Sequence, residues 1–226
     1  MGSRVVRGSL AVLLLAAPAL LGAQGGVSGR VSITERPGER TEDMGNTAVW
    51  LVPQSGNAPA APVTTASIAM QGRKFVPSVR VVGAGSTVEF PNQDPFSHNV
   101  FSKRQPGAFD VGSYPRGRTR AQRLTEPGIY PVYCNIHPRM TAWLLVLGTP
   151  WMTQAEGDGR FALAGVPAGR YTLHVWHNRA PEQVRDLVVP PTGIDGLQLA
   201  LDARGWRYVQ HKNKLGQDYV SAGDRY

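Results

Sequence analysis

Three side chains that bind soft metal ions follow one another at three-residue intervals in one short segment. Cys134, His137 and Met140 occur in the stretch CNIHPRM, which lies between an aromatic run and an apolar run. A tight loop anchored at both ends can direct three side chains toward one point, and His98 begins another apolar run. Two imidazoles and a thiolate in a trigonal plane, with a weak axial thioether, bind copper and allow one-electron exchange. The sequence therefore predicts one type 1 copper ion, with His98, Cys134, His137 and Met140 as its ligands.

Two other chemistries use cysteine and histidine together. Structural zinc sites take four nitrogen or sulfur ligands, usually with more thiolates, and do not use methionine. A cysteine nucleophile beside a histidine base is compatible with the spacing of Cys134 and His137. Cys134 is the only cysteine of the chain and could also be a free thiol or form an intermolecular disulfide. Copper is favoured because it uses all three ligand types and the upstream histidine.

The first 23 residues have the pattern of a secretory signal peptide. Arg4 and Arg7 precede the apolar run LAVLLLAAPALL, which ends in small residues. This run is too short for a stable membrane anchor, and no later segment reaches the length of a transmembrane helix. We therefore expect an exported chain, periplasmic or secreted, that starts near Gln24 and has no transmembrane span.

The chain is basic, with 24 lysines and arginines, 16 acidic residues and a formal net charge of +8. A positive balance favours acidic partners or anionic surfaces. Nucleic acid is not an expected partner, because the chain is exported and carries no nucleic-acid-binding motif.

Short runs rich in Val, Phe, Tyr and Leu alternate with turns that contain many of the 26 glycines and 18 prolines. This pattern is typical of antiparallel β-sandwiches and predicts an all-β protein. The predicted strands are Val27–Ile33, Ala48–Val52, Val79–Val82, Thr87–Phe90, Asn99–Phe101, Arg120–Leu124, Ile129–Cys134, Ala142–Leu147, Arg160–Leu163, Arg170–Trp176, Val184–Val188 and Leu197–Leu201.

The segment Lys74–Leu147 resembles the plastocyanin and amicyanin branch of the cupredoxins. KFVPSVRVVGAGSTVEF is similar to the first two strands of plastocyanin-like proteins, FSHNVF to the segment with the first histidine ligand, and EPGIYPVYCNIHPRM to the segment with the other three ligands. The Cys-x2-His-x2-Met spacing resembles the short ligand loop of amicyanin. The resemblance implies a Greek-key β-sandwich in which Asn99 ties the strand of the first histidine to the cysteine loop.

The segment Gly157–Leu187 resembles the carboxypeptidase-regulatory-like domain, a small transthyretin-type sandwich. The residues that carry the resemblance are DGRF at 158–161, GVPAG at 165–169 and YTL at 171–173. The first two strands typical of that family stand before the cupredoxin segment, which predicts that the cupredoxin is inserted and that strands in 27–52 pair with strands in 160–201. The predicted bounds are 1–23 for the leader, 24–62 and 149–203 for the regulatory-like sandwich, 63–148 for the cupredoxin, and 204–226 for a polar tail.

Three further histidines could be considered as ligands. His174 and His177 lie on one predicted strand, and three residues of separation place them on opposite faces. His211 lies in the predicted tail without another ligand-type residue near it in the sequence. We therefore expect no second metal site from these residues.

The resemblance implies an electron carrier rather than an enzyme, because four protein ligands leave no position for a substrate. The chain lacks the His-Cys-His arrangement of multicopper oxidases, and a single cysteine cannot build a copper pair bridged by two thiolates. The alternatives are a copper-storage protein or chaperone without redox turnover, and a structural or adhesion module with a lapsed site. The intact ligand set argues against the last.

The expected route for electrons is the edge of His137. Phe96, Pro95 and Pro138 would form a small apolar docking patch around it, as weak redox encounters require. Basic residues would steer a redox protein with an acidic docking surface toward this patch. These residues are Lys103, Arg104, Arg116, Arg118, Arg120, Arg123 and Arg139.

Overall fold

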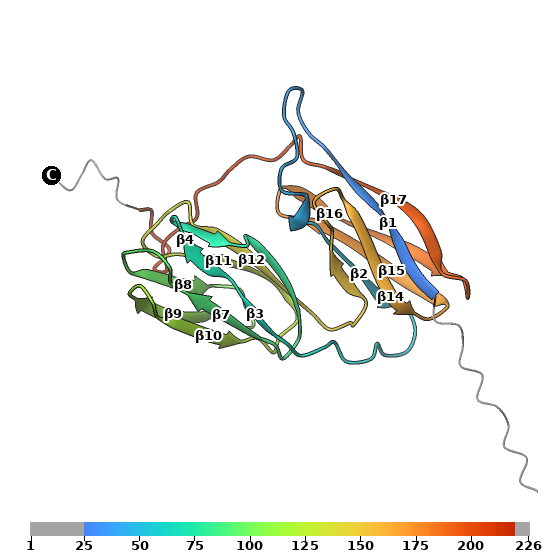
Figure 1. The fold of residues 1–226 in the computed structure, drawn as a ribbon, viewed down its shortest axis with the longest axis horizontal. Coiled ribbons are helices and arrows are strands. Elements are labelled where there is room, and N and C mark those ends of the chain that lie inside the picture. Colours follow the sequence, from blue (N-terminus) through green and yellow to red (C-terminus); the bar gives the residue numbers. More distant parts are fainter. Residues whose placement is uncertain (1–24, 220–226) are drawn as a thin grey trace, which may run out of the picture.

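The computed structural model describes residues 25–219, which form two β-sandwiches joined along an apolar interface (Figure 1). The predicted leader and residues 220–226 of the predicted tail lie outside this range. The described elements are β-strands apart from one 3-10 turn at Met44–Asn46, so the predicted all-β class is confirmed. Within residues 25–219, no helix has the length and apolar character needed to cross a membrane.

The first sandwich carries the predicted ligands and contains strands β3 to β12. One layer is a five-stranded sheet in the order β6-β12-β11-β8-β9, and the other has the order β10-β7-β3, with a β4-β5 hairpin beside them. The strands are β3 Thr65–Ser67, β4 Ala69–Gln71, β5 Lys74–Val76, β6 Val79–Gly83, β7 Thr87–Pro91, β8 His98–Ser102, β9 Phe109–Tyr114, β10 Thr119–Arg123, β11 Gly128–Tyr133 and β12 Thr141–Leu147.

The core of this sandwich follows from the alternation of side chains along its strands. In β11 the side chains of Tyr130 and Val132 point inward, whereas those of Ile129, Pro131 and Tyr133 stay partly exposed. They pack with Phe90, Leu144 and Val146 from β7 and β12 in one apolar cluster. Cys134 and Met140 belong to the same cluster, so two of the predicted ligands lie at the end of the core.

The second sandwich combines strands from before and after the first. Its sheets have the orders β14-β1-β17 and β13-β2-β15-β16. The strand β1 pairs antiparallel with β14 and parallel with β17, and β2 pairs antiparallel with β13 and β15. The predicted pairing of strands in 27–52 with strands in 160–201 is therefore present. The strands are β1 Gly25–Thr34, β2 Ala48–Pro53, β13 Met152–Gln154, β14 Arg160–Val166, β15 Gly169–His177, β16 Ala180–Val189 and β17 Ile194–Asp202.

An apolar interface joins the two sandwiches. Trp50 and Trp176 of the second sandwich share a buried cluster with Val79 and Leu145 of the first. The rings of Trp143 and Trp176 meet edge to face with centroids 5.5 Å apart, a favoured aromatic geometry. The Gln154 side chain accepts a hydrogen bond from the backbone of the first sandwich. Extensive burial of large apolar side chains holds the two sandwiches together.

Five strands were not predicted from the sequence: β3, β4, β5, β9 and β13. Four of them have three residues each, too few for an alternating pattern to be recognised. The fifth, β9 (FDVGSY), contains Asp and Gly, which are depleted in strands. It forms because its backbone pairs with β8 along the edge of the five-stranded sheet.

Candidate metal centre

Two strand ends and one hairpin loop bring the predicted ligands together. His98 is the first residue of β8, and the loop 134–140 (the ligand loop) connects β11 to β12, whose register pairs Tyr133 with Thr141. Two hydrogen bonds close the loop, from the Cys134 amide to the Met140 carbonyl at 3.2 Å and from the Met140 amide to the His137 carbonyl at 3.0 Å. Because β8 pairs with β11 in the same sheet, His98 lies beside this loop.

The ligand atoms converge on one point. Cys134 Sγ lies 3.7 Å from Nδ1 of His98 and 3.6 Å from Nδ1 of His137. A metal bonded to nitrogen at about 2.0 Å and to sulfur at about 2.3 Å, in a trigonal plane, would separate the two atoms by about 3.7 Å. Among the described residues, these three form the one group of histidine, cysteine or acidic side chains with metal-site geometry.

Burial differs sharply between the predicted ligands. The side chains of His98, Cys134 and Met140 are inaccessible or nearly so, whereas His137 is partly exposed. Met140 packs in the same apolar cluster as Cys134. The arrangement shields the thiolate and the thioether from water and leaves the His137 imidazole as the edge of the site that faces solvent.

A buried carboxylate orients His98. Asp94 Oδ2 lies 2.7 Å from Nε2 of His98, and the Asp94 carboxylate also accepts hydrogen bonds from the backbone amides of Gly72 and Arg73. Burial raises the pKa of Asp94, but the hydrogen bonds from Arg73, His98 and Gly72 outweigh it and hold this pKa below its usual range. An ionised Asp94 requires the proton on Nε2, which directs the lone pair of Nδ1 toward Cys134.

Sequence reasoning missed Asp94. The available signal was an Asn-x-Asp turn just before the histidine strand: the Asn92 side chain accepts from the Asp94 amide and donates to the carbonyls of Phe96 and Tyr114. Asn and Asp side chains that bond to nearby backbone are typical of such turns. Here the turn aims a carboxylate at the ring that follows four residues later.

The role expected of Asn99 is wrong. Its amide donates to Asp110 Oδ1 on β9 at 2.7 Å, and its Oδ1 is buried without a partner. The side chain points to the sheet edge and ties β8 to β9 instead of to the ligand loop. Within the ligand loop, the Asn135 side chain is bound by a residue from another part of the chain: its Oδ1 accepts a hydrogen bond from the backbone amide of Lys214 at 2.8 Å.

The exposed edge of His137 lies in an aromatic and basic setting. Its ring centroid is 4.8 Å from that of His98 and 5.5 Å from that of Phe96. The Arg73 guanidinium lies 5.2 Å from the Phe96 ring centre, a cation–π distance. Burial is the main cause of the lowered pKa of His137, and the positive charge of Arg73 adds to it. Both effects keep its imidazole neutral, which is the form that binds metals.

The remaining histidines have other partners. His174 Nδ1 lies 2.7 Å from Glu182, and its ring stacks on Trp50. His177 is buried and contacts Asp43, so the two histidines take part in different networks. His211 does come close to the site, since its ring stacks on Tyr133 with centroids 4.2 Å apart. His211 belongs to the part of the chain that follows β17 and contacts the ligand loop.

Similarity to known proteins covers less than half of this chain. Plastocyanin from Ulva prolifera is 36% identical over 72 residues, 28% of this chain and 74% of the plastocyanin. Plastocyanin from Ulva arasakii is 38% identical over 72 residues, with the same coverage. No family model matches the chain.

Among solved structures, a purple cupredoxin from Nitrosopumilus maritimus is 24% identical and covers 36% of this chain and 99% of its own, with a TM-score of 0.34. A Cu(I) amicyanin variant is 21% identical and covers 37% and 82%, with a TM-score of 0.35. Because both TM-scores are low, the family assignment rests on the sequence match with the algal plastocyanins alone. That match spans about three quarters of each plastocyanin, and this chain belongs to the plastocyanin-like cupredoxins.

Proposed function

We propose that the chain is an exported type 1 copper protein that transfers single electrons between redox protein partners. Its ligands are His98, Cys134, His137 and Met140. The observation that carries this proposal is the convergence of the Cys134 thiol with two imidazole Nδ1 atoms at 3.6 and 3.7 Å. The copper ion, when bound, supplies the one-electron change between Cu(I) and Cu(II).

The residues fit copper better than other metals. A thiolate and a thioether are soft donors, and two imidazoles beside them complete the set used for blue-copper electron transfer. Zinc would leave the buried Met140 thioether without a role. The carboxylate of Asp94 holds His98 in one tautomer, and the two hydrogen bonds across the ligand loop hold Cys134 and Met140 in place. A site held this firmly favours small rearrangement on electron transfer.

A carrier is preferred to an enzyme because four protein side chains complete the coordination and leave no position for a substrate. Electrons would enter and leave at the edge of His137, since the other three ligands are buried. Beside this edge lie Phe96 and Pro138, and Ile136 exposes about half of its surface, 48%. A small apolar patch of this kind suits a short-lived encounter.

The basic residues of the first sandwich lie at two opposite ends of its strands. Arg116 and Arg118 belong to the turn between β9 and β10, where the Asn92 amide donates to the Arg118 carbonyl near the metal end. Arg104 and Arg123 lie at the opposite end, where they bond to the carbonyls of Pro127 and Gly85. We therefore propose that the steering charges for an acidic partner are those at the metal end, including Arg73 and Arg139.

The second sandwich is proposed to be a carboxypeptidase-regulatory-like domain that contains the cupredoxin, residues 63–148, as an insertion. The pairing of β1 with β14 and β17, and of β2 with β13 and β15, supports this arrangement. Export rests on the signal-peptide pattern of residues 1–23. The role of the second sandwich would be to hold the cupredoxin in a fixed orientation through the shared apolar interface.

The test is the visible absorption spectrum of the copper-loaded protein. Thiolate-to-copper charge transfer should give an intense blue or green colour that is lost in Cys134→Ala. A colourless copper complex would exclude the proposal. Slow electron self-exchange, together with ready loss of copper to chelators, would instead favour storage or delivery of copper.

A further inference from the structure

After β17 the chain returns to the first sandwich and runs along it, as the red segment in Figure 1 shows. Residues 206–219 (the C-terminal segment) belong to neither sandwich as a strand. The segment starts at Trp206, whose ring lies 5.9 Å from the Arg179 guanidinium of the second sandwich. It ends beside the ligand loop, where it makes contacts along most of the loop.

Three hydrogen bonds from the segment end on the ligand loop. The Tyr208 hydroxyl donates to the Pro138 carbonyl at 2.9 Å, and the Lys214 amide donates to Asn135 Oδ1 at 2.8 Å. The Tyr219 hydroxyl donates to the carbonyl of Cys134 at 2.7 Å. The contacts therefore hold the backbone of the cysteine itself and the loop on both sides of His137.

Aromatic side chains pack against the same side of the ligand loop. His211 stacks on Tyr133, the residue before Cys134, with an angle of 22° between the rings. The Tyr219 ring meets His211 edge to face at 5.3 Å, and its oxygen lies 3.3 Å from His211 Nδ1. Burial lowers the pKa of His211 and raises that of Tyr219, as expected for side chains packed into a surface that excludes water.

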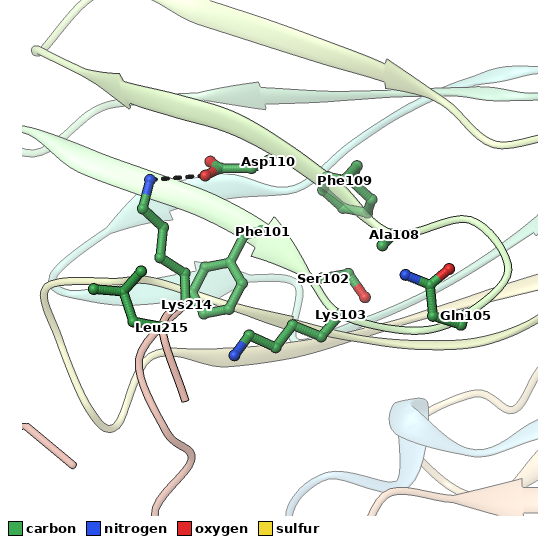
Figure 2. A pocket seen from close by; sticks show the side chains of 9 residues that line it. All are labelled: Phe101, Ser102, Lys103, Gln105, Ala108, Phe109, Asp110, Lys214 and Leu215. Carbon is green, nitrogen blue, oxygen red and sulfur yellow. Dashed lines mark hydrogen bonds and ion pairs between the residues drawn. The ribbon is translucent and has the colours of Figure 1, made fainter. Parts of the chain in front are cut away.

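A second anchor lies farther along the sheet. Figure 2 shows Lys214 extended past Phe101 to Asp110, with Nζ 2.9 Å from the carboxylate. Asp110 in turn accepts the amide of Asn99, the neighbour of His98. The segment is thus attached both to the ligand loop and to the strand pair that carries the first histidine.

We propose that the C-terminal segment is a clamp for the ligand loop, in which Tyr219 acts as a positioning residue for Cys134. The naming of loop residues as copper ligands rests on the proposed function; the clamp itself rests on the contacts above. Loop carbonyls that would otherwise face water are bound by side chains tethered to the second sandwich. The clamp restricts backbone motion at Cys134 and keeps water away from the thiolate.

The first test uses the metal-free protein and amide hydrogen exchange. The amides of Cys134 and Met140 close the loop, so their exchange reports loop opening. In Tyr219→Phe they should exchange roughly two- to tenfold faster, the change expected from loss of one hydrogen bond. Tyr171→Phe is the matched control, because that hydroxyl donates to the Pro167 carbonyl at 2.9 Å in the second sandwich. Unchanged exchange at Cys134 and Met140 in Tyr219→Phe would overturn the clamp.

The second test separates positioning from a merely structural contact. In the copper-loaded protein, Tyr219→Phe should lower the reduction potential relative to wild type, because the lost donor and the added access of water both favour Cu(II) over Cu(I). Tyr171→Phe should leave the potential unchanged. Equal potentials for Tyr219→Phe and wild type would refute the positioning role. If the wild type binds no copper, the proposed function fails, while the exchange experiment still decides the clamp.

Discussion

His98 and Asp94 form a buried pair in which the imidazole Nε2 and a carboxylate oxygen are 2.7 Å apart. The two ring nitrogens of His98 therefore have different contacts: Nε2 is hydrogen-bonded to the carboxylate, and Nδ1 faces Cys134. Carboxylate–histidine pairs of this kind fix both the tautomer and the ring orientation of a metal ligand.

The first prediction concerns this pair. Asp94→Asn should weaken copper binding by about 10- to 100-fold, the usual cost of losing a ligand's hydrogen-bond partner. A competition titration with a calibrated copper chelator measures the change. Asp158→Asn is the control, because Asp158 also accepts a backbone amide, that of Arg160, but lies in the second sandwich. Equal affinities for Asp94→Asn and the control would show that Asp94 does not orient the ligand.

The second prediction concerns the axial position. Met140→Gln should keep the intense colour, since the thiolate remains, but should lower the reduction potential because an amide oxygen replaces a thioether. Cyclic voltammetry and the visible spectrum measure the two properties. Met152→Gln, in β13 of the second sandwich, should change neither. An unchanged potential in Met140→Gln would argue that Met140 is not a ligand.

The third prediction concerns electrostatic steering. Reversal of Arg116, Arg118 and Arg139 to glutamate should slow association with an acidic redox partner roughly tenfold at low salt, and added salt should reduce the difference. Stopped-flow kinetics at several ionic strengths measures the rate, and the copper spectrum should stay the same.

The matched control for this experiment reverses Lys103, Arg104 and Arg123. It changes the net charge equally but includes the two arginines that bond at the opposite end of the sandwich. If both triple variants slowed association to the same extent, net charge rather than a patch at the metal end would account for the effect.

The fourth prediction concerns an ionic cluster in the second sandwich. Arg179 pairs with Glu35 at 2.8 Å and with Asp43 at 2.6 Å, and His177 also contacts Asp43. Arg179→Met should lower the free energy of unfolding by about 2–3 kcal/mol, below the cost for fully buried pairs because the guanidinium retains some contact with water. Urea unfolding at neutral pH measures the loss; a change below about 0.5 kcal/mol, typical of surface substitutions, would contradict it.

The same cluster predicts a pH dependence. The hydrogen bond from Arg179 lowers the pKa of Glu35 below its usual 4.5. Burial raises the pKa of Asp43, but His177 and Arg179 outweigh it and leave this pKa well below its usual 3.8. Carboxyls with lowered pKa stabilise the folded state above their unfolded pKa and lose this contribution as the pH falls through the folded pKa. Wild-type stability should therefore decline below about pH 4.5, and Arg179→Met should show a shallower decline.

The ligand loop could be predicted from the sequence because its chemistry is local. Cys134, His137 and Met140 lie within seven consecutive residues, and the flanking aromatic and apolar runs form β11 and β12 as predicted. Side chains this close along a tight hairpin loop have few ways to point apart. The upstream histidine was predicted because it begins another apolar run and also matches the segment with the first histidine of plastocyanin-like proteins, and the structure places it beside the thiol.

The surroundings of the site were decided by tertiary structure. Asp94 bonds to His98 only because a turn folds the carboxylate back onto the ring, and β9 forms only because β8 offers its edge. Tyr219 reaches Cys134 across 85 residues of sequence. Contacts of this kind leave no periodic pattern in the sequence, since any chain segment with a hydroxyl at the right place can make them. They depend on where two independently packed sandwiches bring the chain, and that is set by the apolar interface around Trp143 and Trp176.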